Sequence, residues 1–534
     1  MNELWSELVT TAMLGVERRA LALPTTDGAL GEVLRQLDLA DREGMLLGAA
    51  ATVALARRAG RLPLQRAPTH TIPAGEDDLP LCPPRAVQHL TALLGGGHQR
   101  ALLPEWLAAL AATGRRVPPA QLPALLDLGR TQPDLRPAIA PALGRRGAWL
   151  AGQNPDWGYA SGAFRVPFED LSFELDSEQF RTQNSDLKTA WETGTRAARI
   201  ALLADARATA PQIARELLSL TWASEKADDR AAFIATFERS LSMADEPLLE
   251  SLLDDRSKEV RRTVAALLVR LPESRLAQRM LARALPVLSL APKEKSRLLG
   301  WRPGQPARLV VAPPAECDAA MVRDGIDPQP PAHRQKLGTK AWLLIQVLGA
   351  VPPAIWSGQW QIAPADLLKL AAASEWKAAL IEGWRAAALA TRDAEWAAAL
   401  LADDPSAEDL IDALAPAQQE RLLLVLLRGD CTPLHKHPVL DLLRKTRHTW
   451  SPDLTRAALR AVHRHMRKWK DTYDYQLRGA LTEEFARRIP PSMLAEVAAG
   501  WPDEPDVRER WQGVIDKLLI TLQFRHDMLA ALER

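Results

Sequence analysis

Residues 245 to 271, DEPLLESLLDDRSKEVRRTVAALLVRL, decide what kind of fold this chain adopts. Leucines recur at helical spacing in the first half, and Pro247 suits a first helical turn, where its missing N–H costs nothing. The polar run that starts at Asp254 interrupts this pattern, and Ser257 is placed to cap a second helix. From Val260 onward, apolar side chains fall on one helical face and charged side chains on the other. The stretch therefore predicts two short helices joined by a tight turn.

A helix pair of this size cannot bury its apolar stripe alone, so it predicts a stack of similar neighbours. Amphipathic segments of comparable length follow one another over most of the chain, and the 40 prolines suit the starts and connections of many short helices. Ala and Leu dominate while Tyr and Phe are scarce, which favours helix over sheet. We therefore expect an all-α fold, an α-solenoid of helical hairpins stacked in a right-handed sense, with irregular inserts.

The run Asp255-x4-Val260-Arg261-x2-Val264-Ala265 resembles the second half of a HEAT repeat. The resemblance implies that the aspartate caps or braces the turn, that the valine packs between helices, and that the arginine faces the neighbouring repeat. The hairpins of the predicted solenoid are therefore expected to be HEAT-like.

Four stretches extend the resemblance to a whole family: TTAMLGVERRALALP (10–24), LGRRGAWLAGQNPDW (143–157), DDRSKEVRRTVAALLVRLPES (254–274) and MVRDGI (321–326). Together they look like an uncharacterised bacterial all-helical family. Its members are typically encoded beside MoxR-type AAA+ ATPases, VWA-domain proteins and SWIM zinc-finger proteins. The resemblance implies a protein partner, an AAA+ ATPase or a VWA-domain protein, and it carries no catalytic motif to transfer.

Composition excludes several classes of protein. The formal net charge of the 534 residues is +1, so bulk electrostatics indicate no partner. Cys82, Cys317 and Cys431 lie far apart, which argues against a disulfide framework and fits a reducing compartment. The N-terminus lacks an apolar core of signal-peptide length, and the strongest apolar run, 422–427, is far too short to span a bilayer. We expect a cytoplasmic protein without membrane association or cofactor.

Changes in composition divide the chain into five segments. They are an N-terminal helical region (1–150), an aromatic-rich irregular linker (151–186), HEAT-like helical repeats (187–290), an irregular insert (291–336) and a C-terminal helical repeat region (337–534).

Three local expectations follow within these segments. Helices are predicted over 187–205 and 274–289, and Leu309–Val311 could form a short strand in the insert. Trp376, Trp384 and Trp396 are spaced by eight and twelve residues, which suits core positions on successive helices better than a ligand cage.

The sequence Cys431-x3-His435-x-His437 has the ligand types that zinc prefers, and His448 or Asp441 could complete a set of four. The spacing matches no common zinc pattern, and the nearby prolines indicate a loop. We therefore predict a loop with incidental histidines and no metal site.

The helix predicted over 453–469 carries a basic stripe in a near-neutral protein. The stripe consists of Arg456, Arg460, His463, Arg464 and Arg467. Such a stripe could hold phosphate groups or an acidic protein surface. The alternative is a solvated face that acids on neighbouring helices neutralise. These five residues are the candidate partner-binding site.

The sequence favours a non-catalytic scaffold or adaptor that binds a protein partner, because stacked repeats offer a long surface and need no catalytic pocket. No Walker, Rossmann, G-x-S-x-G or H-E-x-x-H motif stands in its required context, and no catalytic residue is assigned. One alternative is nucleic-acid binding, including a HEAT-like DNA glycosylase that uses the basic helix. Another is a hydrolase centred on the 300–334 insert, with Asp318, Asp324 and Asp327 around a deep pocket.

Overall fold

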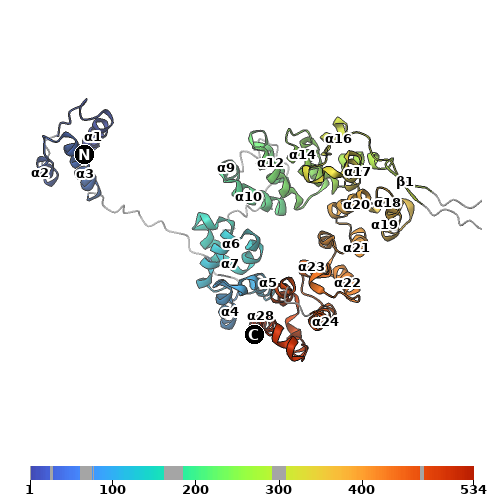
Figure 1. The fold of residues 1–534 in the computed structure, drawn as a ribbon. Coiled ribbons are helices and arrows are strands. Elements are labelled where there is room, and N and C mark those ends of the chain that lie inside the picture. The colour runs from blue at the N-terminus through green and yellow to red at the C-terminus, as the bar shows by residue number, and fades with distance from the viewer. Residues whose placement is uncertain are drawn as a thin grey trace, which may run out of the picture. The chain divides into compact units, whose positions relative to one another are not determined.

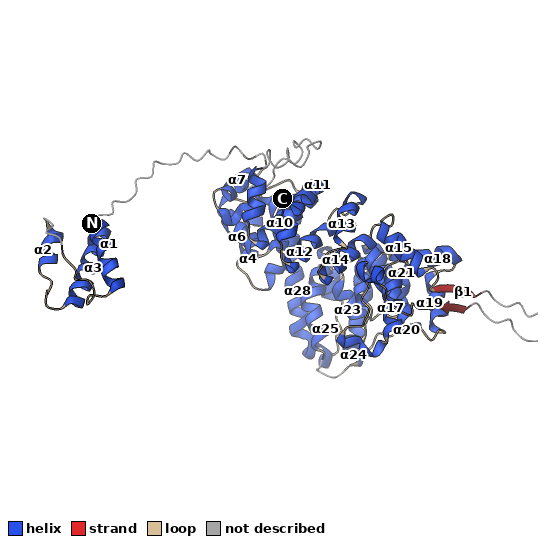
Figure 2. Cartoon of the chain, turned by 90° about the horizontal axis from the view of Figure 1, so that it is seen from above, coloured by secondary structure: helices blue, strands red, loops and turns tan. Residues whose placement is uncertain are grey.

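A computed structural model describes residues 2–23, 28–59, 75, 77, 79–160, 185–291, 308–469 and 474–533. Regular structure in these residues is almost entirely helical, with a single pair of short strands (Figure 2). The prediction of an all-α protein is confirmed. The chain divides into two compact units, Met1–Pro73 and Ala74–Arg534. The borders predicted near 150, 186, 290 and 336 stay predictions, and most of the predicted 151–186 linker lies outside the described residues.

The first unit contains three helices: α1 (Asn2–Leu14), α2 (Ala29–Arg35) and α3 (Arg42–Ala59). Its core is small and consists of Leu4, Leu8, Leu34, Ala49 and Val53.

The second unit begins with four helices: α4 (Pro84–Leu94), α5 (Leu103–Ala112), α6 (Leu122–Thr131) and α7 (Arg136–Gly152). Their core also contains Met528, Ala531 and Leu532 from the last helix, α28 (Pro505–Glu533). The first and last helices of this unit therefore lie side by side (Figure 1). A second, larger hydrophobic core runs from Leu187 to Leu522.

The next stretch is a succession of short helices. They are α9 (Ser185–Thr193), α10 (Arg196–Thr209), α11 (Pro211–Thr221), α12 (Ala227–Ala235), α13 (Glu246–Leu252), α14 (Lys258–Val269) and α15 (Arg275–Ala284). The hairpin predicted from residues 245–271 is confirmed as α13 and α14. Pro247 lies in the first turn of α13, and the Ser257 hydroxyl accepts a hydrogen bond from the Val260 N–H.

Two predicted helix boundaries in this stretch are wrong. The helix expected over 187–205 is broken at Gly194, where Thr195 caps α10 by accepting from the Ala198 N–H at 3.3 Å. The helix expected over 274–289 ends at Ala284, because β1 (Leu288–Ala291) pairs antiparallel with β2 (Arg308–Val311). The strand predicted at Leu309–Val311 is confirmed. Residues 292–307 of the insert lie outside the described residues.

One polar link recurs between successive helical pairs. Arg199, Arg230 and Arg261 are 31 residues apart and stand at corresponding positions of α10, α12 and α14. The Glu225 carboxylate pairs with Arg199, while the Glu225 carbonyl accepts from Arg230 at 2.6 Å. At the next helical pair, the Asp255 carboxylate pairs with Arg230 at 2.9 Å, and the Asp255 carbonyl accepts from Arg261 at 2.7 Å. Each acid therefore joins two consecutive arginines across a helix–helix turn.

After the short helix α16 (Ala319–Arg323), the remaining helices complete the unit. They are α17 (Thr339–Gly349), α18 (Ala354–Trp360), α19 (Pro364–Ala372), α20 (Lys377–Thr391), α21 (Ala394–Asp403), α22 (Pro416–Leu427), α23 (Val439–Lys445), α24 (Pro452–Lys468), α25 (Tyr475–Ala480), α26 (Ala486–Arg488), α27 (Leu494–Ala499) and α28. Gly383 lets α17 and α20 approach closely, since a Cβ there would lie 2.8 Å from the Leu348 Cβ. Trp384 and Trp396 are fully buried, with ring centroids 4.9 Å apart, so their predicted core positions are confirmed. Trp376 lies at the N-cap of α20 and is only partly buried against the core.

No single helix of the described residues has both the length and the apolar composition to cross a bilayer. Only α17 and α18 taken together, at an angle of 84°, reach both.

Candidate functional site

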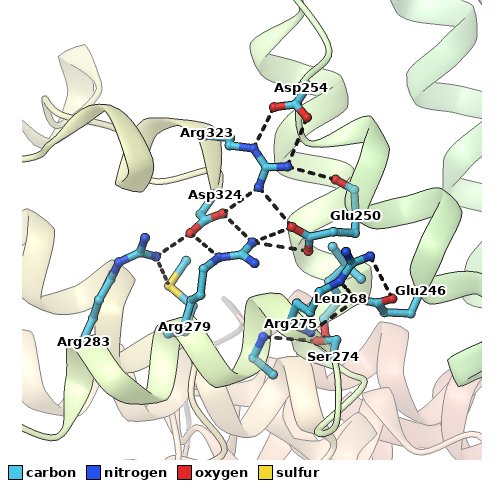
Figure 3. A network of polar contacts seen from close by, with 12 residues as sticks. Glu246, Glu250, Asp254, Leu268, Ser274, Arg275, Arg279, Arg283, Arg323 and Asp324 are labelled. Atoms are coloured by element: carbon cyan, nitrogen blue, oxygen red, sulfur yellow. Dashed lines mark hydrogen bonds and ion pairs between the residues drawn. The ribbon is translucent and has the colours of Figure 1, made fainter.

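A polar network of several arginines and acids lies between α13, α15 and α16 (Figure 3). Glu250 of α13 accepts hydrogen bonds from Arg279 of α15 and from Arg323 of α16, the latter at 3.0 Å. Asp324, at the end of α16, pairs with Arg279 and Arg283 at 2.7 Å each. Burial alone would raise the pKa of Asp324, but its hydrogen bonds to the two arginines outweigh burial and lower that pKa.

This network fastens the end of the insert to the helical pairs. Every carboxylate in it has a guanidinium partner. The other two insert aspartates are engaged elsewhere. Asp318 caps α16 by accepting from the Met321 N–H at 2.7 Å, and Asp327 pairs with Arg262 and with Lys258. The three acids proposed to ring a hydrolase pocket therefore hold three separate structural contacts.

A cavity of about 490 Å³ opens between the end of α21 and the loop before α23. Its wall combines two carboxylates, an ammonium group and an imidazole, and it is lined by Pro405, Ser406, Glu408, His435, Lys436, Pro438, Asp441 and Gln476. Glu408 is already paired with Lys445 at 3.4 Å. Both signs of charge are therefore present in its wall.

The proposed zinc ligands do not converge. The Cys431 thiol lies 3.4 Å from the Leu426 carbonyl, and burial raises its pKa. The His437 Nδ1 accepts from the Val439 N–H at 3.2 Å, while the His435 ring packs against His465 and Trp469. No three His, Cys, Asp or Glu side chains in the described parts of the chain form a group that could hold a metal ion.

The five residues of the basic stripe all lie on α24, but three of them have local partners. Arg456 forms two hydrogen bonds with Glu496 of α27, the shorter at 2.7 Å, and Arg467 bonds to Glu504 at 2.7 Å. The His463 ring packs edge-on against Trp501, with centroids 5.2 Å apart. Burial and the nearby Arg467 lower the pKa of His463 to about 4, so this histidine is neutral at pH 7.

The other two residues of the stripe keep their charge available. Arg460 is exposed, and within the described residues it has no ion pair or hydrogen-bond partner for its guanidinium. Arg464 donates only to a backbone carbonyl, that of Leu427 on α22, at 3.2 Å. The stretch of sequence that contains them is basic, since residues 428–488 include 14 Lys and Arg but 7 Asp and Glu.

The structure adds two arginines from α22 that the sequence analysis missed. Arg421 and Arg428 are exposed, and the Arg421 guanidinium bonds only to the Ala417 carbonyl of its own helix. Val425, which is 60% exposed, lies on the same face between them. We name Arg421, Arg428, Arg460 and Arg464 the basic ridge. The spacing of four and three residues in Arg421-x3-Val425-x2-Arg428 could have indicated this helical face from the sequence. The sequence could not have indicated that the face lies next to α24.

Comparison with known proteins places nearly the whole chain in one family. The model for a family of unknown function, DUF5691, matches residues 7–532. No curated protein matches the chain, and no solved structure matches it. The match fits the resemblance to an uncharacterised family that the sequence motifs indicate.

Proposed function

The chain belongs to the family of unknown function DUF5691, and from that premise we propose that it is a non-catalytic, HEAT-like helical scaffold or adaptor for a protein partner. The observation that carries the proposal is the recurring link of Arg199, Arg230 and Arg261 to the acids Glu225 and Asp255. A contact that recurs at a fixed residue spacing is what a stack of equivalent helical hairpins produces. Such a stack offers a long surface on which another protein binds.

The distribution of charge supports a structural role for the interior and a binding role for the surface. The acids of the network in Figure 3 are committed to arginines of neighbouring helices, so they have little capacity left for chemistry. The four arginines of the basic ridge on α22 and α24 have no carboxylate partner among the described residues, and three of them are exposed while Arg464 is half-buried.

The family resemblance suggests what the partner is. We propose a MoxR-type AAA+ ATPase or a VWA-domain protein of the same bacterial system.

The proposal is tested by affinity purification of the tagged full-length chain from its native host, followed by mass spectrometry, with the untagged strain as control. We expect a protein of one of these two classes to be enriched. After separate purification, that protein and the chain should form a complex when they are mixed. If neither class co-purifies, the partner assignment fails. If no protein at all binds stoichiometrically, the scaffold proposal fails with it.

A further inference from the structure

We propose that the basic ridge of α22 and α24 docks an acidic segment of the partner protein in which carboxylates flank an exposed apolar side chain. The inference rests on the proposed function, because it names the surface and the chemistry by which the scaffold would hold its partner. It concerns Arg421, Arg428, Arg460 and Arg464, together with Val425.

The ridge consists of arginines that have no carboxylate partner in the described part of the chain, whereas other basic residues of α24 do have one. Along α24, Arg456, Arg467 and Lys468 are neutralised by Glu496, Glu504 and Asp430 respectively. The four ridge arginines have no carboxylate partner among the described residues. A guanidinium binds a carboxylate in a bidentate manner and is less strongly hydrated than an ammonium, so unpaired arginines are well suited to capture carboxylates.

The spacing within the ridge fits a short segment of polypeptide. Arg421 and Arg428 are about 10 Å apart along the axis of α22, and Arg460 and Arg464 are about 6 Å apart along α24. The two pairs adjoin, because Arg464 bonds to the carbonyl of Leu427, the residue directly before Arg428. Carboxylates on successive turns of an acidic helix, or on alternate residues of an extended segment, fall within this range.

Val425 distinguishes a protein ligand from a nucleic acid. It is an exposed aliphatic side chain between two arginines, and it offers an apolar contact for which a phosphate backbone has no counterpart. None of the ridge residues is aromatic, so the ridge lacks the stacking platform that single-stranded nucleic acids use.

The test measures the affinity of the full-length chain for three fluorescent probes by anisotropy. The probes are a synthetic peptide of glutamates with leucine at every fourth position, a peptide of glutamates alone, and a single-stranded oligothymidylate of equal net charge. We expect the leucine-containing peptide to bind most tightly. The double variant R421E/R460E should weaken its binding by about tenfold or more.

The matched control is R85E/R100E, which makes the same change in net charge at two exposed arginines of the second unit. It should leave peptide affinity unchanged, and V425S should reduce the leucine-containing peptide to the affinity of the all-glutamate peptide. Thermal unfolding confirms that every variant is folded. Equal peptide affinity of R421E/R460E and the unsubstituted chain would overturn the proposal. Tighter binding of the oligothymidylate, lost in R421E/R460E, would overturn it in favour of nucleic acid.

Repeating the affinity purification with R421E/R460E separates this inference from the proposed function. A partner that is enriched by the unsubstituted chain and lost from the double variant supports both proposals. If the double variant retains the partner, the scaffold proposal is supported and the proposal that the basic ridge is the docking surface is overturned.

Discussion

At the scale of single residues, the second unit contains a fully buried charge pair. Arg207 donates to both carboxylate oxygens of Asp245, at 2.7 and 2.8 Å, and to the Arg239 and Ser240 carbonyls. We predict that Arg207→Ala lowers the free energy of unfolding by about 3 kcal/mol, because it leaves Asp245 buried with fewer partners. Urea denaturation followed by circular dichroism measures this change.

The control for this prediction is Arg215→Ala. Arg215 bonds to the same carboxylate at 2.8 Å but is partly exposed, so its loss should cost much less. If the two variants lose equal free energy of unfolding, burial of the Arg207–Asp245 pair does not determine how much the pair stabilises the protein.

A second residue-scale prediction concerns pH. The folded protein holds the pKa of His463 at about 4, below its ordinary value of 6.5, so the unfolded chain binds a proton there more readily than the folded chain. The stabilising contribution of neutral His463 to the free energy of unfolding is therefore fully present above pH 6.5 and is lost as the pH falls toward 4. With allowance for partial exposure, we expect His463 to account for about 1–2 kcal/mol of this decrease.

Urea denaturation at pH 7.5 and pH 5 tests this effect, because most carboxylates stay ionised between these values. The variant His463→Gln, which carries no titratable ring, should lose less stability over this interval than the unsubstituted chain. The same loss in both proteins would place the pH dependence on other groups.

At the scale of the element, the turn between α13 and α14 offers a contrast between two adjacent aspartates. Asp255 is nearly buried, and its carboxylate accepts from the Ser257 N–H at 2.7 Å and from Arg230 at 2.9 Å. Asp254 is largely exposed and pairs with Arg323. We predict that Asp255→Ala lowers the free energy of unfolding by about 2–3 kcal/mol, because both the turn and the link to the previous hairpin lose an acceptor.

The neighbouring variant Asp254→Ala should change stability little, since exposed ion pairs contribute little. Thermal and urea denaturation of the two variants, which differ by one position in the same turn, give the comparison. If Asp254→Ala proved the more damaging, the recurring Arg–acid link would not be what holds successive hairpins together.

At the scale of the whole molecule, Arg525 joins the two ends of the second unit. It is fully buried on α28, where it donates to both carboxylate oxygens of Glu105 at 2.7 Å and to the Ala486 and Ile489 carbonyls. We predict that Arg525→Ala lowers the stability of the contact between α28 and α4–α5 by about 2–4 kcal/mol. Hydrogen–deuterium exchange should then become faster across α4 and α5, while α10–α15 keep their protection.

Arg508 is the matched control, because it lies on the same helix but is 61% exposed. Arg508→Ala should leave exchange in α4 and α5 unchanged. Uniformly faster exchange throughout the second unit of Arg525→Ala would mean that its two hydrophobic cores unfold as one.

The sequence by itself determined the helical class and many of the local boundaries. Pro247 and Ser257 mark helix starts through contacts within four residues, so their effect is independent of the rest of the chain. The apolar face that contains Val260 and Val264 is likewise set by helical periodicity, and both residues are buried.

Only the tertiary structure decided which charges on α24 were left without a carboxylate partner among the described residues. The stripe on α24 is visible as a pattern, but Arg456 and Arg467 are neutralised by residues 40 and 37 positions away. The partnership of α22 with α24 and the pairing of β1 with β2 also depend on segments that are distant in the chain. Periodicity fixes which face of a helix is polar, whereas ion pairing and strand pairing depend on packing between elements, which no local pattern encodes.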